Sequence, residues 1–157
     1  QGTAKKPYLI ASKKDLLDLA EELSKEYGKY RESHYKLTKD INLGSTEWIP
    51  MCHDMAPFLG VFDGNGHRIT IKKIAGRNNA GLFSSIDTKG IVKNLIVKSS
   101  INGKIATKGG LNFGLIAGRS GGTIINCTTE GTIKLTVNAA QDINIGGVVG
   151  RLEGHAT

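Results

Sequence analysis

The chain repeats one short pattern three times, as Ala80-Gly81-Leu82-Phe83-Ser84, as Gly114-Leu115-Ile116-Ala117-Gly118 and as Gly146-Gly147-Val148-Val149-Gly150. The interval from the first copy to the second is nearly the same as the interval from the second copy to the third. A unit this small cannot bury its apolar side chains alone, so repeats at a near-constant spacing stack on one another. The pattern therefore predicts a solenoid.

A strand-like segment follows each of the first two copies and places Asn94 and Asn126 at equivalent positions, one repeat apart. Stacked strands lie about 4.8 Å apart, so we expect the two side-chain amides to bond along the solenoid axis as an amide ladder. Interior aliphatic pairs should form in the same way, namely Val92 with Ile125 and Leu82 with Ile116.

These features predict an all-β fold, a right-handed parallel β-helix, with one capping helix. A β-sandwich or barrel is the alternative, but antiparallel folds do not require equivalent residues at a constant offset. The repeat glycines should let neighbouring coils approach closely and supply corners with positive φ. These structural positions are Gly81, Gly114, Gly118, Gly146, Gly147 and Gly150.

The helical pattern lies near the N-terminus. Ser12 followed by Asp15 is a variant of the capping box, and apolar residues then recur at helical spacing. These residues are Leu16, Leu19, Ala20, Leu23 and Tyr27. We predict an amphipathic helix over about 13–27, stopped by Gly28, that covers one end of the strand stack.

The length and composition fit one domain, which we divide into a cap region over 1–34 and β-helix coils over 35–157. The 21 glycines are about twice the average share. A formal charge of +7 can attract acidic polymers, but the lysines are scattered, so we expect no specific nucleic-acid partner. No apolar run approaches the roughly 18 residues of a membrane span, so we expect no membrane insertion of this segment.

Three further motifs accompany the glycine repeats: Phe58-Leu59-Gly60-Val61-Phe62-Asp63-Gly64-Asn65-Gly66-His67, Ile91-Val92-Lys93-Asn94-Leu95, and Trp48-Ile49-Pro50. Together with the repeats they resemble the GLUG motif, found in bacterial surface and adhesin-like proteins and in some immunoglobulin A-cleaving metallopeptidases. The resemblance covers about 37–154, with Ser84 where the family usually has glycine. It implies an extracellular β-helix, secreted or at the cell surface, with no catalytic residue to transfer.

Two short motifs could suggest metal binding. Asp63-Gly64-Asn65-Gly66 resembles the start of an EF-hand loop, but the twelfth position of that loop would be Ile74 in place of glutamate. We therefore predict a tight turn, in which Asp and Asn bond their own backbone. Cys52, His53 and Asp54 have no second Cys/His pair at ligand spacing, so we expect neither a metal nor a cofactor.

The acidic residues argue against an enzyme. Polysaccharide hydrolysis uses paired carboxylates, whereas the acids after the helix are spread singly, with Asp54 and Asp87 closest to equivalent positions. The leading hypothesis is a non-catalytic scaffold or adhesin-like module of a larger bacterial protein. The alternatives are a glycan- or host-protein-binding module, or an accessory segment of a peptidase or a polysaccharide-acting enzyme.

Exposed aromatic residues near the helix could provide a platform against which a sugar stacks. The candidates are Trp48, Tyr30, Tyr35 and His34, although a tryptophan at this place is more often a packed residue under the capping helix. The last repeat lies close to Thr157, so we also expect the C-terminal coil to be covered, by a continuation of the parent chain or by an end-to-end dimer. Cys127 should be a small buried member of an interior stack.

Overall fold

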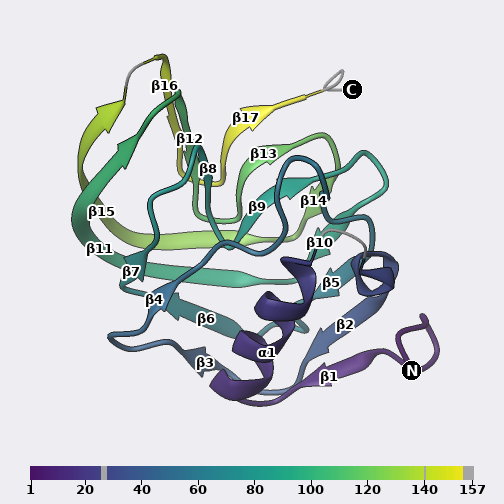
Figure 1. Ribbon diagram of the computed structural model, residues 1–157. Coiled ribbons are helices and arrows are strands. Elements are labelled where there is room, and N and C mark those ends of the chain that lie inside the picture. The colour runs from purple at the N-terminus through teal and green to yellow at the C-terminus, as the bar shows by residue number, and fades with distance from the viewer. Residues whose placement is uncertain (26–27, 140, 154–157) are drawn as a thin grey trace.

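Strands from successive repeats lie side by side in the computed structural model (Figure 1), which describes residues 1–25, 28–139 and 141–153. The helices are α1 (Lys13–Leu23) and the 3-10 helix η1 (Lys29–Glu32). The strands are β1 (Tyr8–Ile10), β2 (His34–Leu37), β3 (Ile41–Asn42), β4 (Glu47–Trp48), β5 (Val61–Asp63), β6 (Arg68–Ile71), β7 (Lys73–Ile74), β8 (Asn79–Ala80), β9 (Phe83–Ile86), β10 (Ile91–Lys93), β11 (Ile96–Thr107), β12 (Leu111–Gly114), β13 (Ala117–Ser120), β14 (Thr123–Ile125), β15 (Thr128–Ala139), β16 (Ile143–Gly146) and β17 (Val149–Leu152).

The strands form stacked sheets in which the named strands pair in parallel. The sheet orders are β1-β2-β5-β10-β14, β15-β11-β6-β3, β16-β12-β8, β17-β13-β9 and β4-β7. Each full winding of the solenoid is called a coil below. The coils begin at β2, β5, β10 and β14, and the last coil consists of β14 to β17. In Figure 1 the long, curved β11 and β15 run together along one side of the molecule.

The pairing register reproduces the spacing of the sequence repeats. Ile91 pairs with Thr123, and Phe83 pairs with Ala117, so each residue lies beside its equivalent in the next repeat. The predicted parallel β-helix, with a single α-helix among the described residues, is therefore confirmed. Repeats separated by one coil length occupy adjacent positions because each coil can bury its apolar side chains only against the next.

The interior pairs agree with the prediction in one case and differ in the other. Leu82 and Ile116 directly precede the paired residues of β9 and β13, and both are fully buried. Val92, however, pairs with Ile124, and the predicted partner Ile125 is 55% exposed. The prediction was wrong by one residue, and a shift of one residue turns a side chain to the opposite face of a strand.

Aromatic rings fill the core beneath the strands. Phe83 lies 4.8 Å from Phe58 and 5.6 Å from Phe62, measured between ring centroids. The buried Trp48 donates from Nε1 to the carbonyl oxygens of Gly81 and Leu82, at 3.2 and 3.1 Å. These contacts join the first coils into one core.

Helix α1 begins as predicted and ends earlier. Ser12 Oγ accepts from the Asp15 N–H at 3.1 Å, and Asp15 Oδ2 accepts from the Ala11 N–H at 2.9 Å. The helix ends at Leu23, not near 27, and its last turn is tightened by i→i−3 bonds from the Ser24 N–H to the Glu21 carbonyl and from the Lys25 N–H to the Glu22 carbonyl. The expected helix residue Tyr27 lies outside the described residues.

The apolar face of α1 packs on the N-terminal part of the stack. Leu16, Leu19, Ala20 and Leu23 are buried, as the spacing predicted. Side chains of α1 border β1 and β2 on one side and β4 on the other, so the helix spans this end of the solenoid. No helix in the described part of the chain has the length and apolar character needed to cross a membrane.

Candidate functional site

A row of polar side chains connects three coils at one corner. Asn126 donates from Nδ2 to Asn94 Oδ1 at 2.8 Å, and Asn94 donates from Nδ2 to Asp63 Oδ1 at 3.0 Å. Both asparagines have a φ of 52°, a left-handed conformation that asparagine tolerates better than most residues. The sequence indicated the two asparagines but not the carboxylate at the start of the row.

Asp63 also organises the turn that follows β5. Its Oδ1 accepts from the Asn65 N–H at 2.8 Å, and His67 N–H donates to the Gly64 carbonyl at 2.8 Å. A Cβ atom on Gly64 would lie 2.5 Å from the Asn94 carbonyl oxygen. The segment 63–66 is thus a tight turn pressed against the next coil.

A second row, which sequence reasoning missed, runs along another corner. Asn144 donates to Asn112 at 2.9 Å, Asn112 donates to Asn79 at 2.7 Å, and Asn79 donates to both carboxylate oxygens of Asp54 at 2.8 and 2.7 Å. The signal was available, because these asparagines also recur one repeat length apart. Each row thus begins at an aspartate and continues through asparagines, all bonded in one direction.

The repeat glycines permit close packing of the coils, but they do not supply positive φ. A Cβ atom would come within 2.5 Å of a backbone atom at five of them, namely Gly81, Gly114, Gly118, Gly146 and Gly150. None of the six predicted glycines is among the described residues with positive φ, so that part of the prediction was wrong. Gly147 has no such close neighbour, since the nearest atom to its Cβ position is Thr129 Oγ1 at 3.8 Å.

The predicted sugar platform does not form. Trp48 is fully buried and Tyr35 is 3% exposed, so neither presents an open ring face. Successive side chains of a strand point to opposite faces. Trp48 therefore points inward beside the exposed Glu47, and Tyr35 points inward beside the half-buried Lys36. Tyr35 lines one pocket with Tyr30 and another with His34, whereas Trp48 lines a third.

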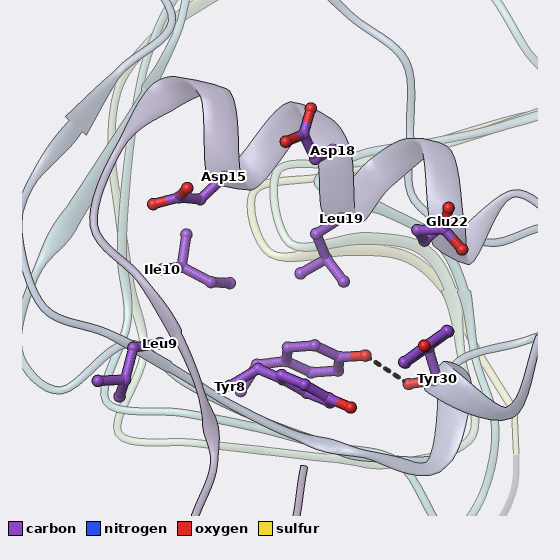
Figure 2. A pocket seen from close by; sticks show the side chains of 9 residues that line it. Tyr8, Leu9, Ile10, Asp15, Asp18, Leu19, Glu22 and Tyr30 are labelled. Carbon is purple, nitrogen blue, oxygen red and sulfur yellow. Dashed lines mark hydrogen bonds between the residues drawn. The ribbon is translucent and has the colours of Figure 1, made fainter. Parts of the chain in front are cut away.

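That pocket lies between α1 and β1 and has a volume of about 180 Å³ (Figure 2). The Tyr8 ring stacks on Tyr35 at 5.6 Å and meets the Tyr30 ring edge-on at 5.9 Å. Tyr8 pairs with Tyr35 in the register of β1 and β2, which places the two side chains on the same face. No sequence pattern pointed to Tyr8, because its strand is only three residues long.

The pocket has an apolar interior and a carboxylate rim. Leu9, Ile10 and Leu19 line it together with the tyrosines, and acidic residues of α1 border it. These acidic residues are Asp15, Asp18 and Glu22.

The Tyr35 hydroxyl donates to the Tyr30 carbonyl at 2.6 Å, and burial raises the pKa of Tyr35 above its ordinary value. Tyr35 is therefore a neutral wall residue at any physiological pH.

The two cysteines are both free. Burial raises the pKa of Cys52 to about 12. Cys127 is only partly buried, contrary to the prediction, and burial raises its pKa too. Its coil is the last in the described structure, so no further coil covers it. Within the described ranges no three His, Cys, Asp or Glu side chains are placed to hold a metal ion.

Asp54 and Asp87 are not brought together. Asp54 accepts from Asn79 and lies 3.8 Å from Arg119 Nη1. Asp87 donates its backbone N–H to the Phe58 carbonyl, and its Oδ1 accepts from the Lys89 N–H. The carboxylates thus serve two different corners, although their separation in the sequence is close to one repeat length.

Two relatives match most of the chain. Halomucin of Haloquadratum walsbyi is 31% identical over 166 aligned residues, which cover 97% of this chain and 2% of halomucin. A protein of Evansella cellulosilytica, named as a Gly-rich membrane protein, is 33% identical over 141 residues, which cover 83% of this chain and 15% of that protein. The chain thus spans a small part of each relative. No family model and no solved structure matches it.

Proposed function

We propose that this segment is a non-catalytic scaffold module, adhesin-like and of the GLUG type, within a larger protein that is secreted or displayed at the cell surface. The observation that carries this proposal is the continuous stacking of coils, reinforced at two corners by side-chain amide rows. A solenoid of this kind is a stiff, extendable spacer. Both relatives are far longer than the chain, and one bears the name of a membrane protein.

The arrangement of the carboxylates supports a role without catalysis. Asp54 and Asp87 are the pair closest to equivalent positions in the sequence. Asp54 accepts a hydrogen bond in an asparagine row, whereas Asp87 accepts one within a turn at another corner. Turnover of an acidic polysaccharide by the purified chain, abolished by Asp54→Asn or by Asp87→Asn, would contradict the proposal.

The test of location uses cells that make the full protein. An antibody raised against the chain should label intact, unpermeabilised cells, or detect the protein in the medium. A brief treatment of intact cells with an added protease should remove the labelling at the surface. Labelling that requires permeabilisation would show that the protein is intracellular and would refute the proposed location.

The tyrosine pocket favours a second candidate function, a ligand-binding module. It is concave and largely apolar, with a few charged groups at its edge, as small-ligand sites commonly are. A glycan array or a screen of host proteins tests this hypothesis. Reproducible binding that is lost on Tyr30→Leu would favour it over a passive spacer.

A further inference from the structure

The interior of the tyrosine pocket offers few partners to a ligand with many hydrogen-bonding groups. The Tyr35 hydroxyl is already bonded to the Tyr30 carbonyl. Leu9, Ile10 and Leu19 contribute only aliphatic surface. A polar group that enters such a site without a partner loses its bonds to water at a cost of about 1–3 kcal/mol. The aliphatic walls therefore offer a polyhydroxylated sugar no partners, and leave only the tyrosine hydroxyls and the rim carboxylates to bind its hydroxyl groups.

The rim is acidic, although the chain as a whole is basic. Asp15, Asp18 and Glu22 stand three and four residues apart, so they share one face of α1. The chain carries a formal charge of +7, whereas the residues at the edge of this pocket that carry a charge are acidic. The rim therefore favours a cationic ligand.

The lysines that pair with this rim leave its charge available. Lys14 binds Asp18 and Lys25 binds Glu22, and these lysine side chains are 81% and 56% exposed. Exposed ion pairs of this kind contribute little to stability. A cation that enters the pocket can therefore gain from the same carboxylates without the loss of a strong existing interaction.

The tyrosine rings supply the second half of a cation site. The face of an aromatic ring carries negative charge density and attracts a cation within about 6 Å of its centroid. Lys29 Nζ already lies 5.5 Å from the centroid of the Tyr30 ring. The half-buried Tyr8 ring, which stacks on the buried Tyr35, extends the aromatic surface into the pocket.

We propose that the pocket between α1 and β1 binds a small quaternary ammonium group, such as that of choline. Such a group has a positive charge but no N–H donor, so an interior with few acceptors imposes no penalty. Its methyl groups can pack on the tyrosine rings and on Leu19, while the rim carboxylates balance the charge. This binding role is independent of the scaffold role.

The experiment is a titration of the intact chain with choline chloride, at constant ionic strength, followed by proton NMR and calorimetry. The matched control ligand is 3,3-dimethylbutanol, which has the same shape and no charge. Choline should bind roughly two- to thirty-fold more tightly than the alcohol, the range expected for cation–π attraction. Ring currents should shift the N-methyl signal upfield.

Variants locate the binding. Asp18→Asn combined with Glu22→Gln should weaken choline binding and leave the alcohol unaffected, and Tyr30→Leu should weaken choline binding more than it weakens alcohol binding. Asp142→Asn removes a carboxylate that lines a different pocket and should change neither affinity. Each variant is first shown to be folded by circular dichroism.

Four results would overturn the proposal, three of which concern choline binding itself. They are the absence of detectable choline binding, equal binding of choline and the alcohol, and a double variant with unchanged choline affinity. Displacement of choline by neutral sugars at equal or lower concentration would also overturn it, in favour of a glycan site. None of these results would bear on the surface location of the protein.

Discussion

The two ends of the solenoid carry the same kind of residues in different surroundings. At the N-terminal end α1 covers the stack, and Leu16, Leu23 and Leu37 are fully buried. In the last coil, which no described residue covers, Ile145 is 55% and Leu152 is 72% exposed. Their partners in the preceding coil, Phe113 and Ser120, are buried. Burial at a position is thus set by whether a layer lies above it.

The largest expected effect comes from a matched pair of substitutions in adjacent coils. Leu111 and Ile143 are register partners, but Leu111 is fully buried and Ile143 is 47% exposed. Leu111→Ala should lower the free energy of unfolding by about 2–5 kcal/mol, and Ile143→Ala by about 1 kcal/mol or less. Urea denaturation followed by circular dichroism measures both, and equal losses would show that the last coil is buried in solution.

The asparagine row should show a smaller contrast of the same kind. Asn94 bonds to a neighbour on both sides, whereas Asn126 bonds on one side within the described structure. Asn94→Ala should cost about 1–3 kcal/mol and Asn126→Ala roughly half as much, from lost hydrogen bonds and a strained φ.

Glycine at the same two positions separates the two contributions. It relieves the strain and leaves only the loss of the bonds. Asn94→Gly should therefore be less destabilising than Asn94→Ala. A glycine variant as unstable as the alanine variant would mean that the positive φ contributes nothing.

The open coil predicts self-association. The chain of 157 residues, produced alone, should pair end to end through the last coil, since Ile145 and Leu152 are exposed there and strand edges without partners readily pair. Ile145→Lys should raise the dissociation constant by about tenfold or more, because it places a charge in an apolar contact. Sedimentation velocity across a range of concentrations measures it. A wild-type chain that stays monomeric at millimolar concentration would exclude this dimer.

The smallest effect concerns the start of the helix at the covered end. Hydrogen bonds, chiefly from the Ala11 N–H, hold the pKa of Asp15 below its ordinary value. A lowered folded-state pKa stabilises the fold above the unfolded value of about 3.9, and this contribution is lost as the pH falls through the folded value. Asp15→Asn should therefore cost less than about 1 kcal/mol at pH 6, and nothing near pH 2. Thermal melts at both pH values test this, and a loss that persists in acid would contradict it.

How much the sequence could reveal depended on whether a feature repeats. The coil register and the Asn94–Asn126 row follow from residues that recur at one spacing. The row through Asn112 recurs equally, with each asparagine two residues before a repeat glycine, so the sequence carried this signal too and it was missed. The resemblance to the GLUG motif stays a prediction.

Features outside the repeats could not be derived. A packed Trp48 could be expected from the usual behaviour of tryptophan, but the strand face on which it lies could not be derived from its neighbours. The tyrosine pocket depends on the pairing of β1 with β2, across an intervening helix. Such contacts between distant, non-repeated segments leave no periodic signal.

The parallel register of adjacent coils is tested most directly by disulfide formation between exposed strand neighbours. Asn102 pairs with Lys134, and the Cα atoms of paired strands lie within disulfide range. In a Cys127→Ser background, the chain with Asn102→Cys and Lys134→Cys should oxidise readily to an intramolecular disulfide. Cys52 should not interfere, because it is buried and its pKa is about 12. The control chain, with Asn102→Cys and Asn138→Cys, should not cross-link. Cross-linking of the control pair in preference to the first pair would contradict the stacking of the coils.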